Sequence, residues 1–252
     1  MQTMETNIPK TSDVFAALLR ADLTTQWRNR RALILTILVP IIILISWKGL
    51  LTYFGSGFVL GNCITVGLMA IGLMGYSNAV ARDREKGIFQ RLRVAPVASW
   101  SIMGSRLMVQ LLMIIIVTCG AFFTGINIDK ITDISVQGYL VGFCMACAGG
   151  CVYLSLGQVI VGLIKNPETV NSTTRLVYFV FIMTGMFGEL NKELPKIVKD
   201  IEHYSPYGTT KQIIMAGLHP ATWTGNDTTC LLLTLGYTVV FTVIGVRKFV
   251  WK

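Results

Sequence analysis

Three cysteines in one apolar stretch come closest, by residue type and spacing, to a chemical site. Cys144, Cys147 and Cys151 stand at positions i, i+3 and i+7, which lie on one face of a helix. Clustered thiolates can bind a soft metal or haem. Such sites usually need further ligands, and the two histidines, His203 and His219, lie in a distant segment. Because small residues let membrane helices approach closely, the sequence favours a packing face here, and we expect no metal site.

The common motifs of hydrolytic and nucleotide-binding sites are missing from the sequence. It contains neither an H-E-x-x-H zinc motif nor a G-x-S-x-G nucleophile elbow. A Walker A loop needs a Gly-Lys pair to hold phosphates, and the chain has no such pair. We therefore expect no catalytic site and no cofactor in this chain, and no ATP bound by that route.

A charged segment follows the longest apolar run. Gly87 interrupts this segment and Pro96 ends it, and Ile88, Leu92 and Ala95 share one helical face. A short helix with a charged start and an apolar face suits docking against a cytoplasmic partner. The alternative is a solvated loop whose basic residues only set the topology. The charged residues, seven within 12 positions, are Arg82, Asp83, Arg84, Glu85, Lys86, Arg91 and Arg93.

The composition places these residues in a membrane protein. Of the 252 residues, 53% are hydrophobic and 14% are charged, whereas a soluble domain carries about 25% charged residues. Disordered chains are poor in apolar residues and rich in charge, so this class is excluded. Six cysteines over this length also argue against a small secreted domain built on disulfides.

Apolar windows predict an all-α fold, a single transmembrane domain with six membrane-spanning helices. A spanning helix needs roughly 20 apolar residues, and each window is nearly free of charge. Two longer connections remain, a cytoplasmic loop at 82–100 and an external loop at 189–227. The predicted spans are about 32–51, 58–81, 107–126, 138–164, 171–188 and 228–246.

The distribution of basic residues predicts the orientation. With both termini in the cytoplasm, the inner segments hold sixteen of the 22 Lys and Arg residues and six of the 13 acidic residues. The inside then has a net charge of +10 and the outside −1. Orientation and attraction to anionic lipid explain this surplus, and no basic face typical of nucleic-acid binding is evident.

Residues 13–31 have the pattern of an amphipathic helix. Polar and charged residues separate its apolar positions, so we expect it to lie in the plane of the membrane interface, against lipid. The alternative is an ordinary helix that turns its apolar face toward a protein core. The apolar positions, at helical spacing, are Phe15, Leu18, Leu19, Leu23 and Trp27.

The charged segment resembles the hallmark segment of the ABC-2 family of export permeases. The likeness rests on Arg84-Glu85-Lys86-Gly87, followed by Leu92 and Pro96-Val97. A second likeness lies after the fifth span, in Leu194-Pro195 and Tyr204-Ser205-Pro206-Tyr207. Ile88 departs from the pattern, because Thr or Ser is usual after the glycine. The amphipathic first helix and six spans complete a likeness that covers nearly the whole chain.

The resemblance implies the membrane half of an ATP-driven exporter in a bacterial plasma membrane. Two permease subunits, alike or different, would pair with two ATP-binding subunits that bind ATP and Mg²⁺. The cargo would be an amphipathic drug, a peptide or a lipid-linked molecule. The contact with the ATPase subunit would be the coupling loop, with Asp83, Arg84, Glu85, Lys86, Gly87 and Arg91.

The fifth span resembles the one that lines the transport path in such exporters. Aromatic and Met side chains suit a bulky apolar cargo because they can repack. They are Phe181, Met183, Met186 and Phe187. Two other classes stay open: an ion- or proton-coupled carrier, and a membrane protein that transports nothing, such as an immunity or sensor subunit.

Overall fold

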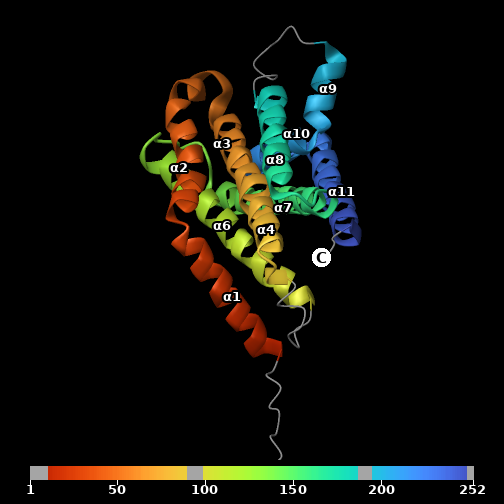
Figure 1. The fold of residues 1–252 in the computed structure, drawn as a ribbon. Coiled ribbons are helices and arrows are strands. Elements are labelled where there is room, and N and C mark those ends of the chain that lie inside the picture. Colours follow the sequence, from red (N-terminus) through yellow and green to blue (C-terminus); the bar gives the residue numbers. More distant parts are fainter. Residues whose placement is uncertain (1–10, 90–98, 187–194, 249–252) are drawn as a thin grey trace, which may run out of the picture.

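The computed structural model describes residues 11–89, 99–186 and 195–248 of the chain, and all regular structure in these ranges is helical (Figure 1). Within these ranges, four helices are long and apolar enough to cross a membrane. They correspond to the second, third, fourth and sixth predicted spans, which confirms an all-α membrane protein. Their bounds are Lys48–Glu85, Ser101–Asn127, Val136–Leu163 and Gly225–Lys248.

The first and fifth predicted spans form shorter helices. Helix α2 (Arg30–Ser46) ends before residue 51, because the chain reverses at Trp47 into the 3-10 turn η1 (Lys48–Leu50). Helix α8 (Pro167–Phe181) begins four residues earlier than predicted, where the Asn166 side chain accepts hydrogen bonds from two backbone N–H groups of its first turn. It continues as the π-helix η3 (Ile182–Met186).

The second span is one long helix in three parts: α3 (Leu51–Met69), the π-helical turn η2 (Ala70–Tyr76) and α4 (Ser77–Glu85). The helix is kinked at Gly55, whose φ of 82° favours glycine. Because α4 remains helical through Glu85, the predicted loop at 82–100 begins four residues later, at Lys86.

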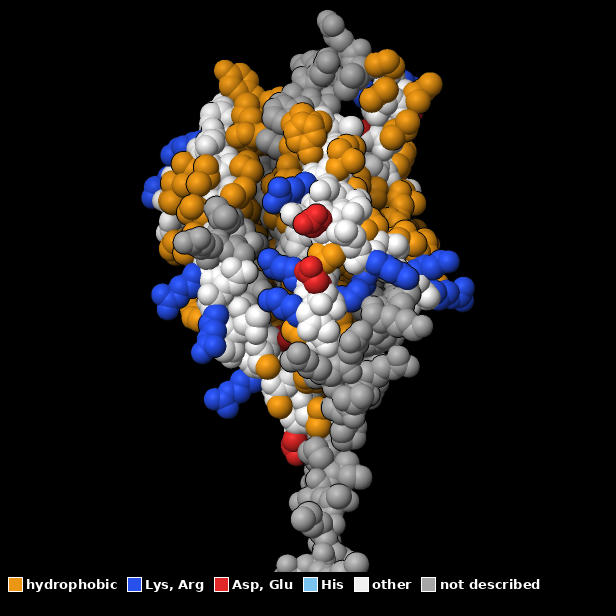
Figure 2. Space-filling model, in the orientation of Figure 1, with side chains coloured by type: hydrophobic (Ala, Val, Ile, Leu, Met, Phe, Trp, Pro, Cys, Tyr) orange, Lys and Arg blue, Asp and Glu red, His pale blue; other side chains and the backbone are white. Residues whose placement is uncertain are grey.

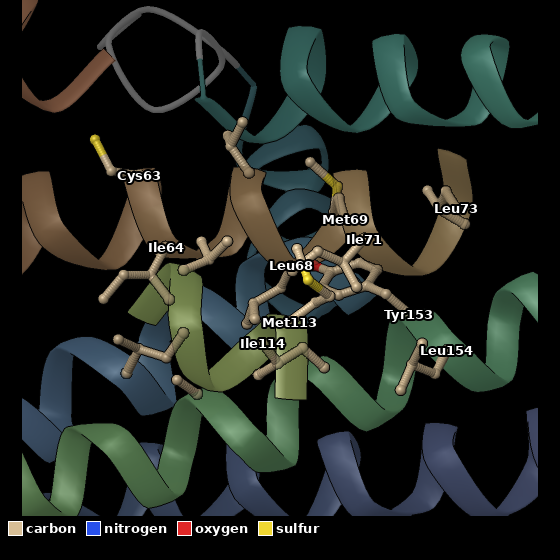
Figure 3. Packing of buried hydrophobic residues seen from close by; sticks show 14 of the residues in the cluster. Cys63, Ile64, Leu68, Met69, Ile71, Leu73, Met113, Ile114, Tyr153 and Leu154 are labelled. Carbon is tan, nitrogen blue, oxygen red and sulfur yellow. The ribbon is translucent and has the colours of Figure 1, made fainter. Parts of the chain in front are cut away.

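Helix α7 (Val136–Leu163) lies at the centre of the helix packing. It contacts η2 and the helices α6 (Ser99–Asn127), α10 (Pro206–Leu218) and α11 (Gly225–Lys248). Figure 3 shows the shared interior, where side chains of α3 and η2, such as Leu68 and Ile71, meet Met113 and Ile114 of α6 and Tyr153 of α7. Helix α7 and η2 also approach closely at Gly157, where an added Cβ would lie 2.5 Å from the carbonyl oxygen of Gly72.

The described part of the predicted external loop, from residue 195 on, contains two helices and a 3-10 turn. Helix α9 (Lys196–Tyr204) is mostly exposed, whereas α10 is buried against α3, α7 and α11. The turn η4 (Pro220–Thr222) follows. Glycines make the burial of α10 possible: a Cβ at Gly61 would lie 2.7 Å from Met215, and one at Gly142 2.8 Å from Leu218. The sequence did not indicate this buried helix.

The segment predicted to be amphipathic forms the helix α1 (Thr11–Arg28), which packs along α6. An added Cβ at Gly104 of α6 would lie 3.4 Å from the Phe15 ring. Leu19 and Leu23 are half-buried, and Trp27 is 68% exposed. The helix therefore uses part of its apolar face against the protein, and its place at a membrane interface stays a prediction.

The bundle has two ends with different chemistry. At the α4 end lie the C-terminal ends of α4, α7 and α11 and the start of α6. At the opposite end, the hairpin end, lie η1, the loop 128–135 and the segment 219–227 (Figure 1). Figure 2 shows a band of Lys and Arg side chains across the molecule, with hydrophobic side chains covering much of the face above it.

Candidate functional site

The α4 end contains the charged segment that the sequence singled out. Asp83 of α4 forms an ion pair with Arg106 of α6, in which Oδ2 lies 2.6 Å from Nη1. The Arg106 guanidinium also lies over the Phe89 ring, 4.8 Å from its centroid. The ion pair is largely screened from solvent, since 10% of the Arg106 side chain and 25% of the Asp83 side chain are exposed. These contacts fix the end of α4 to α6.

Arg84 connects α4 to the end of α7. Its guanidinium donates hydrogen bonds to the carbonyl oxygens of Val161 and Ile164, at 2.5 and 3.1 Å. The last carbonyls of a helix have no partner within the helix, and a cation is favoured there by the helix dipole. Arg84 therefore caps α7, and a displacement of α4 acts on α7 directly.

Glu85 and Lys86 point away from the bundle, and both are exposed. The helix stops here because Gly87 takes a φ of 66°, a left-handed conformation that commonly ends helices. Its N–H donates to the carbonyl oxygen of Arg84. The predicted contact set thus divides into Asp83 and Arg84, which bind the protein itself, and Glu85 and Lys86, which face solvent. Arg91 lies outside the described residues.

A third tie at this end joins α1 to α6. The Ser105 hydroxyl donates to Oδ2 of Asp22 at 2.6 Å, and burial raises the pKa of the Asp22 carboxyl. A small cavity of about 50 Å³ separates α1, α4 and α6, with Asp22, Tyr76 and Asp83 in its wall. Sequence reasoning missed Ser105 and Arg106. The only signal was a lone arginine just before the third apolar window.

Polar side chains also meet inside the bundle. Tyr76 donates to Gln158, and Tyr207 of α10 donates to Asn62 of α3 at 2.6 Å. In the segment predicted to be external, Lys211 is 1% exposed and lies 3.3 Å from Glu202 of α9. The sequence does not predict this buried ion pair. Its only hint is that Lys211 directly precedes a stretch without charged residues.

The residues expected to line a transport path are described only in part. Phe181 is half-buried against the core, and Met183 is 39% exposed. The side chain of Met186 and all of Phe187 lie outside the described residues. Their role in a path stays a prediction.

The cysteine face of α7 is partly open. Cys144 is exposed, whereas Cys147 and Cys151 are half-buried. Among the described residues, no group of three or more His, Cys, Asp or Glu side chains is arranged to hold a metal ion.

The sequence matches the model of one protein family, the ABC-2 family transporter proteins, over residues 48–247. This range runs from η1 to the last turn of α11, so it includes the α4 end, the buried α10 and all four long helices. No curated protein matches the sequence. The match covers well over half of the chain, and the helices agree with a multi-pass transport permease. The chain therefore belongs to the ABC-2 family of membrane transporter proteins.

Proposed function

We propose that the chain is the permease subunit of an ATP-driven exporter, which works with a second permease subunit and with separate ATP-binding subunits. The observation that carries the proposal is the turn at Glu85–Gly87. It presents two exposed, oppositely charged side chains on a helix end that is fixed to α6 and α7. ATP and Mg²⁺ would bind to the partner, because this chain has no phosphate-binding loop of the Walker type.

The geometry supports a mechanical role for this turn. A partner that pushes on Glu85 and Lys86 acts on α4, and through Arg84 on the end of α7. Helix α7 in turn packs against α10 and α11. Inward- and outward-open states would then be two packings of the same helices, whose balance the nucleotide shifts through the partner.

The basic residues support an orientation with the α4 end and both termini in the cytoplasm, while the bacterial assignment rests on the family resemblance and the compact size of the chain. Arg82, Arg84, Lys86, Arg247 and Lys248 all lie at the ends of α4 and α11. Positive charge of this kind favours the cytoplasmic side. An exporter of this orientation would move an amphipathic drug, a peptide or a lipid-linked molecule outward across the plasma membrane.

The test is affinity purification of the tagged chain from native membranes in mild detergent, with identification of the co-purifying proteins and an ATPase assay. Wild type should bring down a stoichiometric partner with a Walker A motif, and Glu85→Arg should lose it or uncouple its activity. The matched control is Asp200→Arg, the same charge reversal on exposed α9. A partner that is retained at full activity by Glu85→Arg would contradict the role of the turn.

One observation favours a second function, a gradient-driven carrier. The Lys211–Glu202 pair places ionisable groups inside the bundle, and such groups in membrane proteins often mark an ion or proton pathway. A carrier of this class would keep transporting after loss of the ATPase subunit and would stop when an ionophore collapses the gradient. Export by an ATP-driven complex predicts the reverse.

A further inference from the structure

At the hairpin end the chain forms an open hollow that the coupling mechanism does not use. A cavity of about 410 Å³ lies between the start of α3, the loop after α6 and the segment that joins α10 to α11. A second cavity of about 410 Å³ shares Asp133, His219 and Thr222 with it. We call the two cavities together the vestibule. A volume of this size suits a drug-sized molecule.

One wall of the vestibule is aromatic. The rings of Phe54 and Phe58 stack with centroids 4.8 Å apart, and Trp47, which does not line the cavity, also stacks with Phe58 at 6.2 Å. Phe54 is 41% exposed, so one ring is open to a ligand. Met215 of α10 also lines this cavity and adds a flexible, polarisable surface. This wall can bind an apolar or aromatic body.

The charged groups of the vestibule are acidic. Asp133 accepts a hydrogen bond from Ser56 at 2.5 Å and is otherwise open, with 57% of its side chain exposed. Asp227 accepts from Gln212 and from the backbone and hydroxyl of Thr224, each at 2.7 Å. All of these donors are neutral, so they hold the carboxylates in place without cancelling their charge.

One basic group acts on these carboxylates from outside the vestibule, since His203 interacts electrostatically with Asp227. His219 is the only titratable base in the walls of the two cavities, with Nε2 4.0 Å from Oδ2 of Asp133. Among the described residues that line the vestibule there is no Lys or Arg. A negative site beside an exposed aromatic ring is the environment that favours an organic cation, since the ring face attracts positive charge as well.

We infer that the vestibule binds an amphipathic organic cation, with the positive centre near Asp133 and the apolar body against Phe54. The inference rests on the proposed function in one respect, because it assigns this chemical class to the cargo of the exporter. The binding itself needs no ATPase subunit, so the two claims can be tested separately.

The experiment uses two probes of the same shape and opposite charge, tetraphenylphosphonium and tetraphenylborate. Equilibrium dialysis of each against the purified full-length chain in a neutral detergent gives the two affinities, with empty micelles as the blank. The phosphonium should bind at least about tenfold more tightly than the borate. Asp133→Asn should weaken phosphonium binding about tenfold, and Phe54→Ala about threefold to tenfold.

Matched controls separate the site from general effects of charge and of apolar surface. Asp200→Asn removes an exposed acid on α9, and Phe123→Ala removes a ring of α6 that is 68% exposed. Neither residue lines the vestibule, so both variants should bind like wild type. Asp133→Glu keeps the charge and should restore most of the affinity, which excludes a mere loss of folding in Asp133→Asn.

Each outcome decides the inference. Equal binding of the two probes would overturn it, and so would an effect of Asp133→Asn no larger than that of Asp200→Asn. If the chain selects the phosphonium but brings down no ATPase partner, the cation site stands and the export proposal fails. If the partner is present but the probes bind equally, the export proposal stands and the cation site fails.

Discussion

The two ends of the bundle use charge in opposite ways. At the α4 end, Asp83 and Arg84 bind other parts of the same chain, namely the Arg106 side chain and two α7 carbonyls. At the hairpin end, Asp133 and Asp227 are held by neutral donors, and both line a cavity. Ion pairs within the chain fix the α4 end in place, whereas the carboxylates of the hairpin end accept hydrogen bonds from neutral donors and have only a histidine, His219, as a base in the cavity walls.

This difference indicates a division of roles along the molecule. The α4 end can pass a displacement to several helices because its ties reach α1, α6 and α7. The hairpin end can recognise a ligand because Ser56, Asp133 and His219 come from three segments that meet around a cavity. Between the two ends, η2 and α7 cross in close contact at Gly72 and Gly157.

The largest effect is expected where this crossing is broken. In Gly157→Leu the new side chain has no room, because a Cβ alone would lie 2.5 Å from the carbonyl oxygen of Gly72 and 2.6 Å from Oγ of Ser77. We expect a loss of about 3 kcal/mol in the free energy of unfolding, measured by denaturant titration in detergent. The control is Gly236→Leu, at an exposed glycine with nothing within 4 Å of an added Cβ. Equal stability of the two variants would contradict the close packing.

An intermediate effect is expected from Arg84→Ala, which removes the cap on α7. The variant leaves two helix-end carbonyls without their charged donor, and we expect a loss of about 2 kcal/mol in the free energy of unfolding. Arg82→Ala is the control, because Arg82 is exposed one turn or less away on the same helix. If both variants lose the same small amount, Arg84 does not tie α4 to α7.

The smallest effect is expected from the pH dependence of the α1 contact. Burial raises the pKa of Asp22, although the hydrogen bond from Ser105 and the charge of Arg106 act against this. The folded protein thus holds this proton more tightly than the unfolded chain, so stability falls as the pH rises from about 4 through the raised pKa.

The variant that tests this is Asp22→Asn, which keeps a hydrogen-bond acceptor for Ser105 and removes the titration. Since the carboxyl is partly exposed, screening by solvent limits the gain in stability at pH 7.5 to less than about 1 kcal/mol. Thermal unfolding in detergent at pH 5 and 7.5 measures it. A wild type that becomes more stable over this pH range relative to Asp22→Asn would contradict the sign.

Much of this architecture follows from the sequence. The windows without charge predict the four long helices of the described chain. An apolar run of that length is stable as a helix across the membrane, where every backbone polar group is hydrogen-bonded within the helix. The charged run at 82–87 likewise marks the α4 end. The reversal between the first two spans was predicted at 52–57 but lies at Trp47 and η1. Its position was misjudged because Lys48 was read as a residue at the end of a longer helix, and only the packing of α2 against α3 shows where the chain turns.

The rest of the site depends on contacts between distant residues. Asp83 meets Arg106, and Ser56 meets Asp133 across 77 positions; no local pattern encodes either pair. The buried α10 was missed for a similar reason: its Lys211 suggests an exposed segment until Glu202 is seen beside it. The sequence therefore indicates which segment carries charge, and the fold decides which charges remain available to a partner.

The central claim, that the turn at Glu85–Gly87 contacts an ATPase subunit, is tested most directly by site-specific photo-crosslinking in native membranes. A photoreactive residue is placed at Glu85, at Lys86 and, as the control, at exposed Asp200 of α9. We expect a protein with a Walker A motif to be captured from the first two positions and not from the third. Capture from Asp200 alone, or equally from all three positions, would contradict it.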